Sequence, residues 1–197
     1  MRHTRLHSQR GISLIEIMVA VGIFTGILGA STAFVQTTGD ALTSGTSRSN
    51  LTTRANQLAE RIADELMRAG LSTISPSDPA GGPVINYRRA MGYENGTATW
   101  GSPLRIEFRP DEDKVVWVRN PGLSSEQEVT WATGIRSYLE GEVANGTDDN
   151  GDGVVDERGL SFRLDDDVLT IMVSLEGRDP KGRTIVRSAT TTIRLRN

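Results

Sequence analysis

Cysteine is absent from the 197 residues, so no disulfide stabilises the fold and no thiolate can act as nucleophile or ligand. Both histidines, His3 and His7, lie at the N-terminus. Serine-histidine triads and histidine-ligated zinc sites are therefore excluded from the rest of the chain. We expect no enzyme activity, although catalysis by carboxylates alone stays open, and no pair of acids stands out for it.

The chain also lacks a large excess of charge of either sign, because its net charge is only −3. Nothing therefore indicates a nucleic-acid partner. The chain is 37% hydrophobic and 24% charged, which is ordinary for a folded protein and excludes a disordered one. Its length suits one domain with an appendage.

A long apolar run, Ile12–Val35, carries a single charge, Glu16. About 20 apolar residues suffice for a helix to cross a bilayer. The basic residues that precede the run are Arg2, Arg5 and Arg10. By the positive-inside rule, the N-terminus stays cytoplasmic and the remainder of the chain is exported.

Two interpretations of this run compete. The first is a secretory signal that is cut after a small-residue site at Ser31–Ala33. The second is a retained anchor that is processed at its front edge. A charge inside the run, and a length beyond the usual apolar core of a signal, count against the first.

The sequence Arg10-Gly11-Ile12-Ser13-Leu14-Ile15-Glu16 resembles the class III signal of type IV pilins and pseudopilins. In that family prepilin peptidase cuts after the glycine and methylates the new N-terminus. The resemblance implies cleavage after Gly11, N-methylation of Ile12, and a role for Glu16 in pairing with the N-terminal amine of a neighbouring subunit. Ile12 replaces the commoner phenylalanine. Such pairing would offset the cost of a carboxylate in the membrane.

The resemblance also implies a location and partners. The chain would be single-pass in the bacterial cytoplasmic membrane, with its head exported, and would then enter a pilus or pseudopilus. Its partners would be prepilin peptidase and other pilin or pseudopilin subunits. The small residues Gly22, Gly26, Gly29 and Ala33 share one helix face, which either permits close packing between subunits or only reflects how common glycine is in membrane helices.

Residues 36–70 are expected to continue the helix. Segment 37–47 contains Gly39 and Gly45, so it is either a soft joint or an ordinary amphipathic stretch. An apolar stripe at helical spacing then follows, and Gly70 is well placed to end the helix. The stripe consists of Leu51, Ala55, Leu58, Ile62, Leu66 and Ala69.

Residues 71–197 are predicted to form an exported β-rich head. After a Pro- and Gly-rich loop at 75–83, short alternating runs indicate strands, and the clearest of them form a C-terminal antiparallel hairpin that packs one face on the helix. The predicted fold class is therefore α+β, with the pilin-like layout of a long helix on an antiparallel sheet. The order of features also resembles a minor pilin or the J-type pseudopilin of type II secretion. The runs are 104–108, 114–118, 129–131, 160–164, 169–175 and 185–195.

The acidic loop 145–157 has the donor spacing of a calcium loop, with oxygen side chains at its first, third, fifth and ninth positions. These donors are Asp148, Asn150, Asp152 and Asp156. Gly153 allows the sharp turn, and the carbonyl of Val154 follows it. Gly159 stands where an EF-hand has its bidentate glutamate, so Asp156 or Glu157 would have to close the shell. The alternative is a solvated turn without a metal.

Two functional hypotheses follow. The leading one is a structural subunit, a minor pilin or pseudopilin, that is processed and assembled into a type IV pilus or a type II secretion pseudopilus. The other is a membrane-anchored or secreted module that binds calcium or adheres to a surface without entering a fibre. Processing and incorporation into a fibre discriminate between them.

Overall fold

The structure is a computed structural model, and it describes residues 13–77, 81–151 and 153–195. The chain divides into two compact units, residues 1–44 and 45–197. One helix, α1 (Leu14–Leu66), begins in the first unit and ends in the second. Segment 37–47, the predicted soft joint, is α-helical at every residue.

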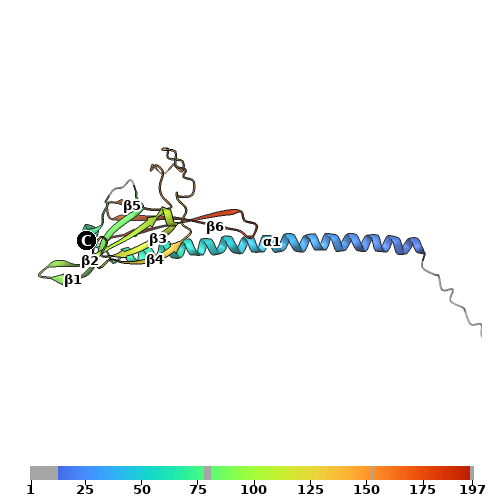
Figure 1. Ribbon diagram of the computed structural model, residues 1–197, viewed down its shortest axis with the longest axis horizontal. Helices are drawn as coiled ribbons and strands as arrows, with labels where there is room; N and C mark the ends of the chain where they lie inside the picture. Colours follow the sequence, from blue (N-terminus) through green and yellow to red (C-terminus); the bar gives the residue numbers. More distant parts are fainter. Residues whose placement is uncertain (1–12, 78–80, 152, 196–197) are drawn as a thin grey trace, which may run out of the picture. The chain divides into compact units, whose positions relative to one another are not determined.

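The second unit adds two short 3-10 helices and seven strands to the end of α1 (Figure 1). Every pairing between the strands is antiparallel. The α+β layout predicted from the sequence is therefore present. Beyond α1 the elements are η1 (Leu71–Thr73), β1 (Val84–Glu94), β2 (Thr97–Arg109), η2 (Pro110–Glu112), β3 (Lys114–Arg119), β4 (Gln127–Thr133), β5 (Leu160–Asp165), β6 (Val168–Arg178) and β7 (Thr184–Arg194).

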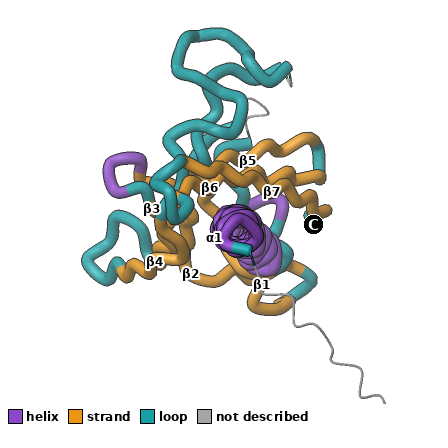
Figure 2. The backbone as a smooth tube through the Cα atoms, turned by 90° about the vertical axis from the view of Figure 1, so that its right-hand side faces the viewer, coloured by secondary structure: helices purple, strands orange, loops and turns teal. Residues whose placement is uncertain are grey.

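The strands form two sheets rather than one. The larger has the order β1-β2-β3-β4, and the smaller has the order β5-β6-β7. Figure 2 shows the smaller sheet on one side of α1 and the larger sheet on the other. Each sheet turns an apolar face to the helix, so a single core forms between them.

The apolar stripe of α1 enters this core as predicted. Leu51, Ala55, Leu58, Ile62 and Leu66 are all buried, and so are the intervening Ala59 and Ala63. The C-terminal hairpin, β6 with β7, contributes Leu169, Ile171, Val173 and Leu175 from β6 and Ile185, Ala189 and Ile193 from β7.

The strand missed by the sequence analysis is β1, and its partner β2 is longer than expected. Register shifts between Arg88 and Gly92 interrupt their pairing. The outer half of β1 is exposed, with Met91 at 72% and Tyr93 at 76%. Alternation is lost there because neither face of the hairpin is covered, so the periodic signal of a half-buried strand is absent.

Gly70 is required for a different reason from the one predicted. The helix ends at Leu66, and a side chain at Gly70 would overlap the ring of Trp100 from β2. Gly70 also has an ordinary extended backbone (φ −86°) rather than the left-handed conformation of a glycine cap. Its role is therefore to let the aromatic ring of the sheet approach the end of the helix.

Candidate functional site

The start of α1, from Leu14 to Glu16, holds the last residues of the motif from which processing is predicted. Gly11 and Ile12 lie outside the described residues. Glu16 is in the first turn of the helix, and its Oε2 accepts a hydrogen bond from the backbone N–H of Ser13 at 2.9 Å. This contact is one half of a capping box, and a negative charge in the first turn is also favourable to the helix dipole. Glu16 therefore stabilises its own helix start.

In the first unit α1 is apolar and exposed, from Leu14 (76%) to Val35 (67%). The helix is long and apolar enough to cross a membrane. A Cβ added at Gly22, Gly26 or Gly29 would meet no atom within 4 Å, so packing within the chain does not require these glycines. The hydroxyls of Thr25 and Thr32 are satisfied by carbonyls one turn earlier, at 2.7 and 2.8 Å.

A partly buried polar cluster ties the second unit's part of α1 to the larger sheet. Tyr87 donates its hydroxyl to Glu65 (2.7 Å) and accepts from the indole N–H of Trp117 (2.9 Å). Arg89 forms two bonds to the Glu65 carboxylate, at 2.7 and 2.6 Å. Burial, together with the Glu65 carboxylate, raises the pKa of Tyr87, and its hydrogen bond to Glu65 raises the pKa of Arg89. Tyr87 therefore stays neutral and Arg89 stays charged over the physiological pH range.

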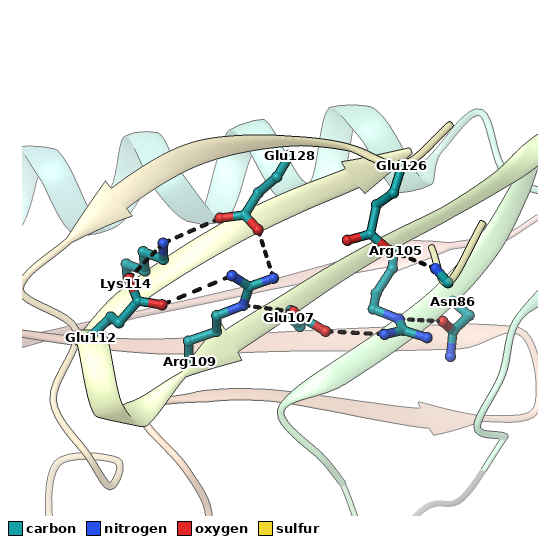
Figure 3. Close-up of polar contacts among 9 residues, drawn as sticks. Asn86, Arg105, Glu107, Arg109, Glu112, Lys114, Glu126 and Glu128 are labelled. Atoms are coloured by element: carbon teal, nitrogen blue, oxygen red, sulfur yellow. Dashed lines mark hydrogen bonds and ion pairs between the residues drawn. The ribbon is translucent and has the colours of Figure 1, made fainter. Parts of the chain in front are cut away.

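The outer face of the larger sheet carries a row of alternating charges (Figure 3). Arg109 contacts Glu107 at 2.9 Å and Glu128 at 2.7 Å, and Lys114 contacts Glu128 at 3.2 Å. Burial raises the pKa of Glu128, but the hydrogen bonds and charges of Lys114 and Arg109 outweigh it and lower the pKa overall. Val116, opposite Glu107 on the same face, is fully buried. This pattern indicates that long charged side chains shield it.

The acidic loop is organised by its own carboxylates. The two carboxylate oxygens of Asp148 accept hydrogen bonds from the N–H groups of Gly151 (2.6 Å) and Gly153 (2.8 Å). The carboxylate of Asp156 accepts hydrogen bonds from the N–H of Asn145 to its Oδ1 and from the N–H of Gly146 to its Oδ2, both at 3.0 Å. These bonds join parts of the loop that are 3 to 11 residues apart in sequence and give the loop a defined shape.

Glu142 is the functional candidate that the sequence analysis missed. It is 1% exposed, and its two carboxylate oxygens accept the N–H groups of Asn150 (3.0 Å) and Asp156 (3.1 Å). It thus joins the two sides of the loop from within. No spacing rule could have identified it, because Glu142 precedes the repeat of donors and only the fold brings it underneath them.

The structure brings some of the predicted calcium ligands together. Glu157 is 5% exposed, and its Oε2 lies 3.5 Å from the side-chain nitrogen of Asn150. Asp152 lies outside the described residues. Among the residues that the structure describes, no three acidic or histidine side chains form a set that could hold a metal. The calcium site therefore stays a prediction.

Gly159, at the position of the missing EF-hand glutamate, is explained by packing. A side chain there would overlap the carbonyl of Arg136. Gly159 donates its N–H to Ser137 (3.2 Å) and accepts from the N–H of Ser174 (2.7 Å), so the end of the loop is held against β6. The backbone approach at this point leaves no room for a ligating side chain.

Comparisons with protein-family models, with curated proteins and with solved structures find no match for this chain.

Proposed function

We propose that the chain is a structural subunit of the type IV pilin-like class, a minor pilin or pseudopilin, cut by prepilin peptidase and assembled into a pilus or a type II secretion pseudopilus. The observation that carries the proposal is the division of α1 into two parts. Its first part is apolar, exposed and long enough to cross a membrane, while its last part is buried between two antiparallel sheets. The motif Gly11–Glu16 supports the proposal at the residue level.

The direct test is the intact mass and the N-terminal sequence of the chain recovered from membranes of its native host. The proposal expects a chain that begins at N-methylated Ile12. A start near Phe34 would instead identify a cleaved secretory signal, and an intact Met1 would identify an unprocessed anchor. Either of these results rejects the pilin-like function.

We also propose that the acidic loop binds calcium. A membrane-anchored or secreted module that does not enter a fibre would use the same property. Two buried carboxylates, Glu142 and Glu157, contact Asn150 at the centre of the loop. An ionised carboxylate offers about four acceptor positions, so those of Asp148 and Asp156 can hold a cation while they accept backbone N–H groups. Calcium takes six to eight such oxygen ligands.

Thermal unfolding of the full chain in detergent tests the calcium proposal. A free calcium concentration of about 100 times Kd stabilises the folded protein by about 2.7 kcal/mol, which raises the Tm of a chain of this size by several degrees. Asp152→Ala, which removes the ligating oxygens, should abolish the rise. Asp166→Asn, in the turn between β5 and β6, is the control and should keep it. A Tm that calcium leaves unchanged in the unmodified chain rejects the site.

A further inference from the structure

A groove runs between α1 and β4 in the second unit. Two adjoining cavities of about 400 and 520 Å³ make it up, and they share Gln57, Arg61 and Trp131. The helix lines one wall, and the edge of the larger sheet lines the other. The groove is thus bounded by side chains on one wall and by a strand on the other.

The helix wall is a row of arginines. Arg54 and Arg61 are seven residues apart and so lie along one flank of α1, while Arg68, in the turn after the helix ends at Leu66, lines the same groove. Arg54 donates to the carbonyl of Thr133 at 2.9 Å, and the guanidinium of Arg61 lies 4.5 Å from the ring centroid of Trp131. Both contacts hold the row beside β4.

These arginines lack carboxylate partners within the part of the chain that the structure describes. Glu65, which also lines the groove, is neutralised by Arg89. Glu60 and Asp64 line the larger cavity too, but helical periodicity places them further round the helix, on the solvent side of the row. The smaller cavity is lined by Arg54 and Arg61 and by no carboxylate among the described residues, so positive charge is concentrated there, next to residues 130–133 of β4.

The strand wall is an open sheet edge. Among the strands that the structure describes, β4 pairs with β3 alone. Residues 127–130 are exposed, and Val129 retains 45% of its accessible surface. The strand contains neither lysine nor proline, which natural edge strands use to prevent further pairing. Four of its residues, Val129, Thr130, Trp131 and Thr133, favour strand pairing. Its one charge, Glu128, is paired with Arg109 and Lys114, and a register shift with β3 falls at Trp131.

We propose that this groove binds an extended acidic segment of a neighbouring pilin-like subunit, which adds a strand to β4. Main-chain hydrogen bonds to the open edge provide affinity, and the arginine row selects carboxylates of the added strand by charge-assisted hydrogen bonds. The inference rests on the proposed function, because fibre assembly is what brings such a neighbour to the groove.

The chain is well suited to a zero-length crosslinking test, because its only lysines are Lys114 and Lys181. Arg68→Lys places an amine in the groove, and a carbodiimide joins an amine only to a carboxylate that touches it. Arg88→Lys, an exposed position on β1 outside the groove, is the matched control. Both substitutions keep the charge, and the full chain is crosslinked in its native membranes.

The expected result is a product at position 68, absent at position 88, in which the joined aspartate or glutamate belongs to a pilin-like subunit. Coupling of the amine at position 68 only to Glu60 or Asp64 of its own chain would overturn the proposal, as would equal products at both positions. A product with a protein that lacks a pilin-type signal would also overturn it.

Charge reversal provides a second measurement. Arg68→Glu should lower the amount of the chain in sheared fibres about tenfold, and Arg88→Glu should not. Equal amounts of the two variants would reject the groove. The N-terminus is determined in the same samples: a chain starting at Met1 rejects the proposed function, whereas N-methylated Ile12 without a groove-specific product rejects only the groove.

Discussion

At the scale of single residues, the contacts of a side chain explain positions that the sequence pattern left ambiguous. Gly70 and Gly159 are each fixed by the close approach of another segment, the ring of Trp100 in one case and the carbonyl of Arg136 in the other. Glu142 is fixed by the two backbone N–H groups that it accepts. Local sequence does not reveal these requirements, because the contacting group is distant in sequence or belongs to the backbone, which is the same for every residue type.

Gly159→Ala should destabilise the second unit by about 2 kcal/mol or more, because the added methyl group forces the loop away from β6. Gly82→Ala is the matched control, since a Cβ there meets no atom within 4 Å. Chemical denaturation of both variants measures the difference. Equal midpoints for Gly159→Ala and the unmodified chain would show that the loop gives way without cost.

The ion pairs on the outer face predict a pH dependence. The folded-state pKa of Glu128 is lowered, so its contribution to stability is present above the unfolded value, about 4.3, and is lost as pH falls through the folded value. Glu128→Gln should therefore flatten the loss of stability in this acidic range. Glu94→Gln, on the exposed hairpin end, is the control. A loss of stability with falling pH that is steeper in Glu128→Gln than in the unmodified chain would contradict a stabilising ion pair at Glu128.

At the scale of elements, α1 changes its surroundings along its length while its backbone stays helical. The residues buried in the core begin at Leu51, and segment 37–47 contains none. The boundary between the two compact units falls inside this same segment. Burial in the core therefore adds little to the stability of this segment, and Gly39 and Gly45 each lower its helix propensity by about 1 kcal/mol.

Backbone amides in segment 37–47 should therefore exchange at least about tenfold faster than those in the buried turns after Leu51. The variant with both Gly39→Ala and Gly45→Ala should slow this exchange, because neither added Cβ meets another atom. Hydrogen exchange with mass spectrometry measures both. Protection in 37–47 equal to that after Leu51 would exclude a soft joint.

At the scale of the whole molecule, the proposed fibre subunit needs an anchor, a folded head and a contact between copies. The apolar, exposed part and the core-packed part belong to one helix, and the partly buried cluster of Glu65, Tyr87, Arg89 and Trp117 fixes the core-packed part to the larger sheet. Glu16 has a role within its own chain, where it caps the helix, beside the proposed role between subunits.

Two variants of Glu16 separate these roles. Glu16→Ala should still insert and be cut, but it should enter fibres poorly because it lacks both the cap and the charge. Glu16→Gln keeps an acceptor for the N–H of Ser13, as glutamine does in capping boxes, but cannot pair with an ammonium. Sheared-fibre fractions are compared for both. Normal incorporation of the glutamine variant would mean that capping, and not charge pairing, is what assembly requires.

The sequence by itself determined the α+β class, the apolar helix with its buried stripe, and the C-terminal hairpin. Each of these depends on a periodic pattern within one segment, and such a pattern is set by the faces that a helix or strand must bury.

Only the tertiary structure decided the division into two sheets, the strand β1, the position of Glu142 and the groove beside β4. These features depend on which segments meet in space. Exposed strands such as the outer half of β1 lack a buried face, and therefore lack a pattern. The groove exists because β4 ends its sheet next to three arginines that precede it by more than 50 residues in the chain. Local sequence cannot encode such a meeting, because it arises only when the core closes around α1.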